Sequence, residues 1–255
     1  MEFTPTPNVP SVLILKADRL YARGIQQAVH TVLPGARVVL ATCIDSAAAS
    51  LGAQCFDLIV TGLEPGLKGD VLDFVSARSR SAARTERTLV VSAEFEQRVV
   101  AALRTLAVNG VFDTATELPG SFIQALEAVM SGQRYWSASV LERMRNEYAA
   151  SSSLFRRLTT AEQLILSVVG DGSDDVSAAR ELGLSPATVS TVRRELHRKL
   201  GVQHRGALIR IAAETGFVRF TEAGVIRPGF GMLTASYLAC RGKRAPGMGE
   251  VAGAP

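Results

Sequence analysis

Short apolar runs alternate with amphipathic segments through the first half of the chain. Five runs have the length and the Val, Leu and Ile content of buried parallel strands, and they lie at 12–15, 38–40, 58–61, 89–92 and 108–112. Between them, apolar residues recur every three or four positions, which indicates one buried face of a helix. The alternation predicts an α/β domain with a doubly wound, five-stranded parallel sheet.

The second half of the chain has helical periodicity only. Thr159 and Glu162 have the spacing of a capping box, which predicts that a helix begins there. Ser185 followed by Pro186 predicts another helix start, and Gly201 predicts where that helix ends. Four helices are expected, over about 159–169, 176–182, 186–200 and 205–215.

Shifts in composition divide the chain into four parts. We expect the α/β domain at 11–132, a linker containing a helix at 133–155, an all-α four-helix domain at 156–218 and a tail at 219–255. Glycine and proline recur in the tail, at positions 224, 228, 229 and 231, so it is expected to be loosely ordered.

Composition excludes several classes of protein. The chain has 255 residues, three well-separated cysteines without a CxxC pair, and a formal net charge of +4. A disulfide framework, a bound metal and a cofactor are therefore not expected. No apolar run approaches the roughly 18–20 residues of a membrane span, and no targeting segment is recognisable, so we expect a cytoplasmic protein without a membrane partner. A mild excess of positive charge is compatible with a nucleic-acid partner.

The segment 186–200 carries most of the candidate chemistry. Its apolar residues are spaced three or four apart and form an inward face, while the opposite side is polar. Four cations stand against the single acid Glu195, and they are Arg193, Arg194, Arg198 and Lys199. A short helix precedes it through a turn that contains Gly183, which is helix-turn-helix spacing. Because an α-helix fits the major groove of B-DNA, double-stranded DNA is the expected partner.

The wider pattern resembles the LuxR-type helix-turn-helix domain of the NarL/FixJ response regulators. The resemblance covers about 156–218 and rests on Leu158–Glu162, Ala178–Ser185, Thr188–Val189, Arg198–Val202, Arg205 and Ala207. It implies that the third helix reads DNA and that the last one serves in dimerisation. It implies base contacts from Ser190, Thr191 and Arg194, and phosphate contacts from Ser185, Thr188, Arg193, Arg198, Lys199 and Arg205.

Two features depart from the family pattern. Ser190 stands where Lys or Arg is frequent, and Val192 stands where His is frequent. In addition, three acids lie in the first interhelical loop, where a phosphate contact is expected: Asp171, Asp174 and Asp175. The target sequence and the affinity for DNA are therefore expected to differ from those typical of the family.

Residues 11–136, approximately, resemble a response-regulator receiver domain, which has a flavodoxin-like fold. The segments that carry the resemblance are Val12–Asp18, Asp57–Gly66, Val90–Ala93, Asn109–Phe112 and Gly132–Trp136. Receivers transfer a phosphoryl group to an Asp carboxylate beside acids that hold Mg²⁺. Here the acidic pair falls on Lys16 and Ala17, the acceptor on Thr61 or Gly62, and the Lys on Asp113, while Ser92 keeps its type.

This degenerate pocket predicts the absence of aspartyl phosphorylation and of a Mg²⁺ site. A cation at Lys16 repels Mg²⁺, and neither Thr61 nor Gly62 offers a carboxylate. As a hypothesis, Lys16 pairs with Asp113 or with Asp18 in place of the metal-centred network.

Together these features predict a DNA-binding transcriptional regulator of the response-regulator type that acts independently of aspartyl phosphorylation. It is expected to form a homodimer, or a heterodimer with another regulator. The alternative is an interaction module that binds a partner regulator or RNA polymerase, with DNA contact secondary. An enzyme is not expected, because no Ser-His-Asp, metal-ligand or phosphate-loop pattern is present.

Overall fold

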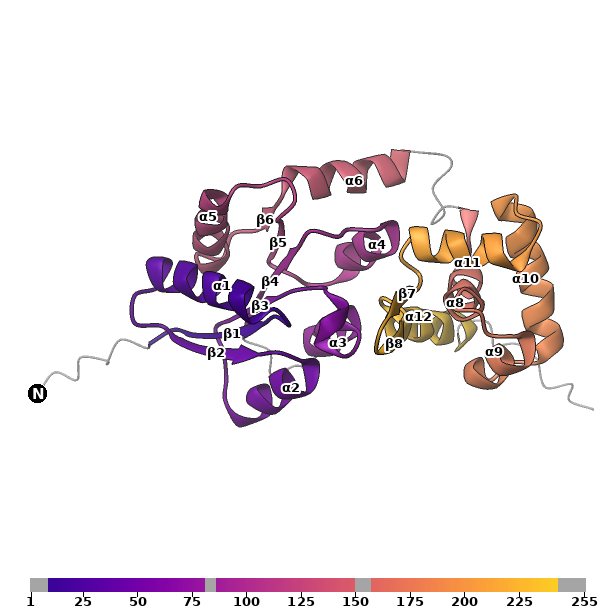
Figure 1. The fold of residues 1–255 in the computed structure, drawn as a ribbon, viewed down its shortest axis with the longest axis horizontal. Coiled ribbons are helices and arrows are strands. Elements are labelled where there is room, and N and C mark those ends of the chain that lie inside the picture. Colours follow the sequence, from indigo (N-terminus) through magenta and orange to yellow (C-terminus); the bar gives the residue numbers. More distant parts are fainter. Residues whose placement is uncertain (1–8, 81–85, 150–156, 243–255) are drawn as a thin grey trace, which may run out of the picture.

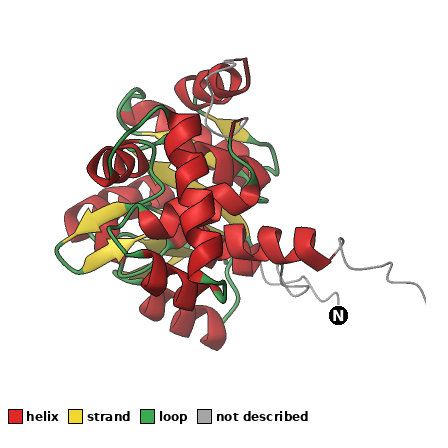
Figure 2. Cartoon of the chain, turned by 90° about the vertical axis from the view of Figure 1, so that its right-hand side faces the viewer, coloured by secondary structure: helices red, strands yellow, loops and turns green. Residues whose placement is uncertain are grey.

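The computed structural model describes residues 9–80, 86–149 and 157–242. An α/β domain and a helical domain lie side by side along the long axis of the molecule, with a short hairpin and a helix between them (Figure 1). Viewed along that axis, the helices of the second domain lie in front of the strands of the first (Figure 2). None of the helices in these ranges is long and apolar enough to span a lipid bilayer.

The α/β domain is built on a parallel sheet with the order β2-β1-β3-β4-β5-β6. Its strands are β1 (Ser11–Leu15), β2 (Arg37–Ala41), β3 (Leu58–Thr61), β4 (Arg87–Ser92), β5 (Gly110–Asp113) and β6 (Tyr135–Trp136). The predicted fold class is confirmed, with one strand more than expected. β6 has only two residues and pairs with Gly110 and Val111, so it is too short to produce a pattern of its own.

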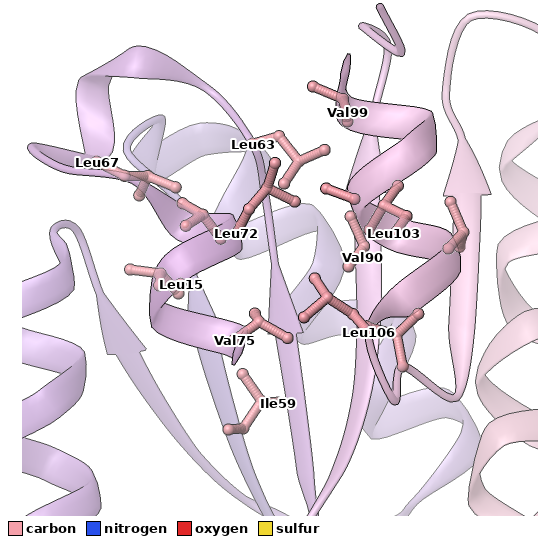
Figure 3. Close-up of a cluster of buried hydrophobic side chains, with 14 of the residues drawn as sticks. Leu15, Ile59, Leu63, Leu67, Leu72, Val75, Val90, Val99, Leu103 and Leu106 are labelled. Carbon is pink, nitrogen blue, oxygen red and sulfur yellow. The ribbon is translucent and has the colours of Figure 1, made fainter. Parts of the chain in front are cut away.

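Helices cover both faces of the sheet. α1 (Arg19–Val32) and α5 (Pro119–Met130) pack on one face, and α2 (Ile44–Ala53), α3 (Val71–Ser79) and α4 (Gln97–Thr105) pack on the other. Figure 3 shows Leu72 and Val75 of α3 and Leu103 of α4 in front of the strands. α6 (Ala138–Ala149) continues from β6 and buries Val140 in the same core.

The helical domain contains α8 (Thr160–Val169), α9 (Asp175–Leu182), α10 (Pro186–Leu200) and α11 (Arg205–Glu214). The predicted helix ends are confirmed. Thr159 and Glu162 form both bonds of a capping box at the start of α8, and the Ser185 side chain accepts a hydrogen bond from the Thr188 backbone at the start of α10. Gly201 ends α10 with a φ of 68°, a conformation that favours glycine.

The expectation of a loosely ordered tail is wrong for residues 219–242. They form a hairpin of β7 (Arg219–Thr221) and β8 (Gly224–Ile226), followed by α12 (Phe230–Gly242). Pro228 and Gly229 form the turn between β8 and α12, while Leu233 enters the core of the helical domain. Residues 243–255 lie outside the described part of the chain.

Replacing Leu233 tests whether α12 belongs to the helical domain. Leu233 is 5% exposed, so Leu233→Ala removes buried apolar contacts and is expected to lower the free energy of unfolding by about 2–5 kcal/mol. Leu238, on the same helix, is 58% exposed, so Leu238→Ala should change it by less than about 0.5 kcal/mol. Urea unfolding followed by circular dichroism measures both. Equal effects would contradict the packing of α12.

Candidate nucleic-acid interface and receiver pocket

α10 packs against the rest of the helical domain through one side only. Val189 and Leu196 are fully buried, and the helix contacts α8 and α9. Thr191 and Arg194 lie on the opposite side and are exposed, while Ser190 is half-buried. The Arg194 guanidinium donates a hydrogen bond to Thr191 Oγ1 at 3.3 Å. Two of the three expected base-reading residues therefore share an open face.

The hydroxyls at the start of α10 are tied to the helix end. Ser185 Oγ and Thr188 Oγ1 lie 2.8 Å apart, and Ser185 Oγ also accepts from the Thr188 backbone. Both side chains are exposed, as is Arg205 at the start of α11. Among the residues that the structure describes, neither Arg194 nor Arg205 has an acid within ion-pair distance.

Three of the expected phosphate contacts are ion-paired within the domain, each at 2.8 Å: Arg193 with Asp175, Arg198 with Glu195, and Lys199 with Glu162. The Arg198 pair is exposed, so its contribution to stability is small. Arg193 and Lys199 instead hold α10 against α9 and the start of α8. Sequence reasoning missed these structural roles, because the acids lie 18 and 37 residues away.

The Glu162 carboxylate accepts hydrogen bonds from both Thr159 and Lys199. Partial burial by itself would raise the pKa of the Glu162 carboxyl, but hydrogen bonds from Lys199 and Thr159 outweigh it and lower that pKa. The carboxylate thus serves both the capping box of α8 and the end of α10.

The acidic loop before α9 is not an open anionic patch. Asp171 pairs with Arg227 of the C-terminal segment. Asp174 caps α9 by accepting from the Ser177 backbone at 2.7 Å, and Asp175 pairs with Arg193. Two of the three acids are therefore paired with arginines, which reduces the repulsion of phosphate that the sequence suggested.

In the receiver-like domain, Lys16 pairs with an acid that sequence reasoning did not select. Its Nζ lies 3.0 Å from Glu64 Oε2 and 3.4 Å from the carbonyl oxygen of Val91, and it sits 4.6 Å from the centre of the Tyr21 ring. Lys16 is 8% exposed. Pairing with Asp113 or Asp18 was therefore wrong. The loop after β3 brings in Glu64 from 48 residues away, and no local pattern marks that approach.

Glu64 folds back over Gly62. A Cβ atom on Gly62 would lie 1.7 Å from Glu64 Oε2, so any side chain at Gly62 would displace the carboxylate. The other carboxylate oxygen accepts a hydrogen bond from the backbone of Ala17 at 3.0 Å. A glycine at one of the two candidate acceptor positions thus leaves the space that Glu64 fills, while Thr61, the other candidate, is fully buried at the end of β3.

The remaining pocket residues have local partners. Asp113 is fully buried and accepts from Ser139 Oγ at 2.7 Å, which fastens α6 to β5. Asp18 caps α1. Ser92 Oγ accepts from the backbone of Glu94 at 3.1 Å at the end of β4. Lys16, Thr61, Gly62, Ser92 and Asp113 all follow or end strands of the sheet, where ligands bind in open α/β folds.

Comparisons with known proteins match these two domains. The luxR family of bacterial regulatory proteins matches residues 156–212. Residues 156–212 are a LuxR-type helix-turn-helix domain. The transcriptional regulatory protein MctR of Rhizobium johnstonii is 33% identical over 96 residues, which is 38% of this chain and 44% of MctR.

Longer matches extend over both domains. The response regulator UvrY of Escherichia coli is 24% identical over 81% of this chain and 94% of its own length. The nitrate/nitrite response regulator NarP of E. coli is 29% identical over 77% and 91%. RcsB from Salmonella enterica serovar Typhimurium, bound to promoter P1flhDC, has the same fold, with a TM-score of 0.56, 21% identity, and coverage of 81% and 99%. The chain has the receiver-plus-helix-turn-helix architecture of NarL/FixJ response regulators, a family of DNA-binding transcription regulators.

The Lys16–Glu64 pair is expected to stabilise the receiver-like domain. Glu64→Gln leaves the buried ammonium without a counter-charge, and the loss should be about 1–2 kcal/mol because Glu64 is 28% exposed. Glu127, exposed on α5, provides the control Glu127→Gln, with a change below about 0.5 kcal/mol. The single tryptophan, Trp136, reports unfolding of this domain by fluorescence. Identical urea midpoints for the two variants would contradict a stabilising pair.

Proposed function

We propose that this response regulator controls transcription by binding DNA through α10, and that its receiver-like domain works without phosphorylation of an aspartate. The observation that supports DNA binding is the open side of α10, where Thr191 and Arg194 are exposed. Arg can donate two hydrogen bonds to guanine in the major groove, which gives about 1–3 kcal/mol of discrimination. Ser190 lies beside this face, and Ser185, Thr188, Arg193, Arg198, Lys199 and Arg205 are the proposed phosphate contacts.

The Lys16–Glu64 pair supports the proposal that the receiver-like domain works without phosphorylation of an aspartate. Phosphoryl transfer in receivers needs a carboxylate nucleophile and acids that hold Mg²⁺. Here a buried ammonium lies at the acidic-pair position, and its positive charge opposes a divalent cation. The nearby carboxylate of Glu64 is engaged by Lys16 and by the Ala17 backbone. The charges of Lys16 and Glu64 thus neutralise each other within the pocket.

A dimer is part of the proposal. A two-fold pair of helix-turn-helix domains reads two half-sites about one helical turn apart. α11 follows α10, and its Arg205, Gly206 and Arg210 are exposed, so it has an open surface for a second copy or for another regulator. Relatives of this architecture include RcsB dimers bound to two parallel DNAs.

The second candidate function is an interaction module for a partner regulator or RNA polymerase. The ion pairs of Arg193 and Lys199 favour it, because partnered cations are less available to phosphates. A mobility-shift assay with the purified chain alone separates the two functions. Binding that requires an added partner protein would support the interaction module and contradict the main proposal.

Exposure to acetyl phosphate tests the receiver proposal. Intact-mass spectrometry of the treated chain is expected to show no added phosphoryl group, and the mobility shift on a bound promoter should be unchanged. A receiver domain that retains its acceptor Asp and its acidic pair, treated in parallel, checks that the reagent is active. A phosphorylated fraction that maps to Asp18 or Asp113 would overturn this part of the proposal.

Two arginine replacements separate base reading from phosphate contact. Arg194→Ala should weaken binding to the preferred sequence by about 1–3 kcal/mol and bring it closer to binding of random DNA. Arg205→Ala should weaken binding to both sequences equally and reduce the salt slope by about 1. Arg23→Ala, an exposed arginine on α1 of the receiver-like domain, is the matched control and should leave affinity unchanged. Equal selectivity in all three variants would show that α10 does not read bases through Arg194.

A further inference from the structure

Arg219 joins the end of the helical domain to two loops of the receiver-like domain. Its guanidinium binds both carboxylate oxygens of Glu96, at the start of α4, and donates to the carbonyl oxygen of Leu63 at 2.6 Å. The Arg219 side chain is 11% exposed. A bidentate pair of this kind fixes orientation as well as distance. Leu63 precedes Glu64 in the loop after β3, so this contact and the Lys16–Glu64 pair share one loop.

Arg98 provides a second, buried link. It lies in the first turn of α4 and is 5% exposed. Its guanidinium donates to the carbonyl oxygens of Pro228 and Gly229, at 3.0 and 2.8 Å, and its backbone N–H donates to the carbonyl of Thr215 at 2.9 Å. A buried guanidinium without such acceptors is costly, so the turn before α12 satisfies a charge of the receiver-like domain.

Two carboxylates at the start of α3, its capping residue Asp70 and Asp73, complete the attachment. Asp70 accepts from the Gly229 backbone, and Asp73 accepts from Gly231 at 2.6 Å and Met232 at 2.9 Å. These N–H groups belong to the first turn of α12, where intrahelical acceptors are missing. An acid from one domain therefore caps a helix of the other, in the orientation that the helix dipole favours. Burial and the neighbouring Asp73 raise the pKa of Asp70 to about 7.

Close approach explains the glycines of this turn. Gly229 has a φ of 67°, and a Cβ there would lie 2.4 Å from the Arg98 guanidinium. A Cβ on Gly231 would lie 2.9 Å from Asp73 Oδ2. Side chains at these positions would push the turn away from α3 and α4.

The same segment also contacts the helical domain through ion pairs and an aromatic ring. Arg227 pairs with Asp171 and Glu181, and its guanidinium lies 5.2 Å from the Phe230 ring. α12 contacts both α3 and α8, and it lies between the two domains (Figure 1). α10 packs on α8 and α9, away from this attachment.

We propose that residues 219–232 form an intramolecular latch that holds the helix-turn-helix domain on the α3–α4 surface of the receiver-like domain, with α10 facing outward. The latch sets one orientation of the DNA-binding helix relative to the receiver-like domain without a phosphoryl signal. It occupies the α3–α4 surface, so an external partner must displace it to bind there. The latch does not depend on the proposed DNA sequence preference.

Interdomain distances test the latch without DNA. Spin labels are placed on cysteines at Leu20→Cys of α1 and Val176→Cys of α9, which are 84% and 55% exposed, in a full-length chain with its native cysteines changed to serine. Pulsed dipolar spectroscopy should give one narrow distance distribution. Arg219→Ala and Gly229→Ala should each replace it by a broad one, and Arg210→Ala, an exposed arginine outside the latch, should leave it narrow.

A variant in the receiver-like domain controls for the possibility that Arg219→Ala or Gly229→Ala misfolds the helical domain. Glu96→Ala removes the acid that Arg219 binds and leaves every residue of the helical domain in place. It should broaden the distribution as Arg219→Ala does, and the double variant should add nothing further. A broad distribution in the parent chain, or a narrow one in Arg219→Ala, Gly229→Ala and Glu96→Ala alike, would overturn the latch. Mobility shifts of the same variants report DNA binding separately, so either proposal can fail alone.

Discussion

Burial of the Lys16 ammonium is the constraint on which the receiver-like domain depends. A charge in that position is tolerated only with a close counter-charge, and Glu64 supplies it at 3.0 Å. Once Glu64 is drawn over Gly62, the loop after β3 is held at the carboxyl end of the sheet. The same loop then offers the carbonyl of Leu63 to Arg219. The Lys16–Glu64 pair therefore accounts for the position of the loop after β3 and, through Leu63, for an interdomain contact.

Charges in the helical domain have two distinct uses. Arg193 and Lys199 face acids of α9 and α8 and hold α10 in place. Arg194 and Arg205 are exposed and belong to the proposed DNA-binding surface. A residue counted as a phosphate contact from its position in a family pattern can therefore serve packing, or both, because a long cationic side chain reaches either an internal acid or solvent.

The C-terminal segment shows why composition alone misled. Its glycines and prolines indicated loose order, yet Gly229 and Gly231 are required where the chain passes within contact distance of Arg98 and Asp73. Eight of the thirteen residues of α12 are apolar or aromatic, but among its described residues only Leu233 is buried, while Phe230, Met232 and Tyr237 are half-buried against the two domains. Apolar residues spread around the helix give a weak periodic signal, so its order comes from tertiary contacts that single-segment patterns do not contain.

Local patterns determined the two-domain fold, because strand runs, capping residues such as Thr159 and Ser185, and stop signals such as Gly201 act within a few residues of each other. They also placed the open face of α10, since its 3.6-residue period separates Val189 from Arg194. Only the tertiary structure decided the partners of the buried charges. Glu64 reaches Lys16, Glu96 reaches Arg219 and Asp73 reaches Met232 across 48, 123 and 159 residues, because folding brings together loops whose separation along the chain carries no information about distance.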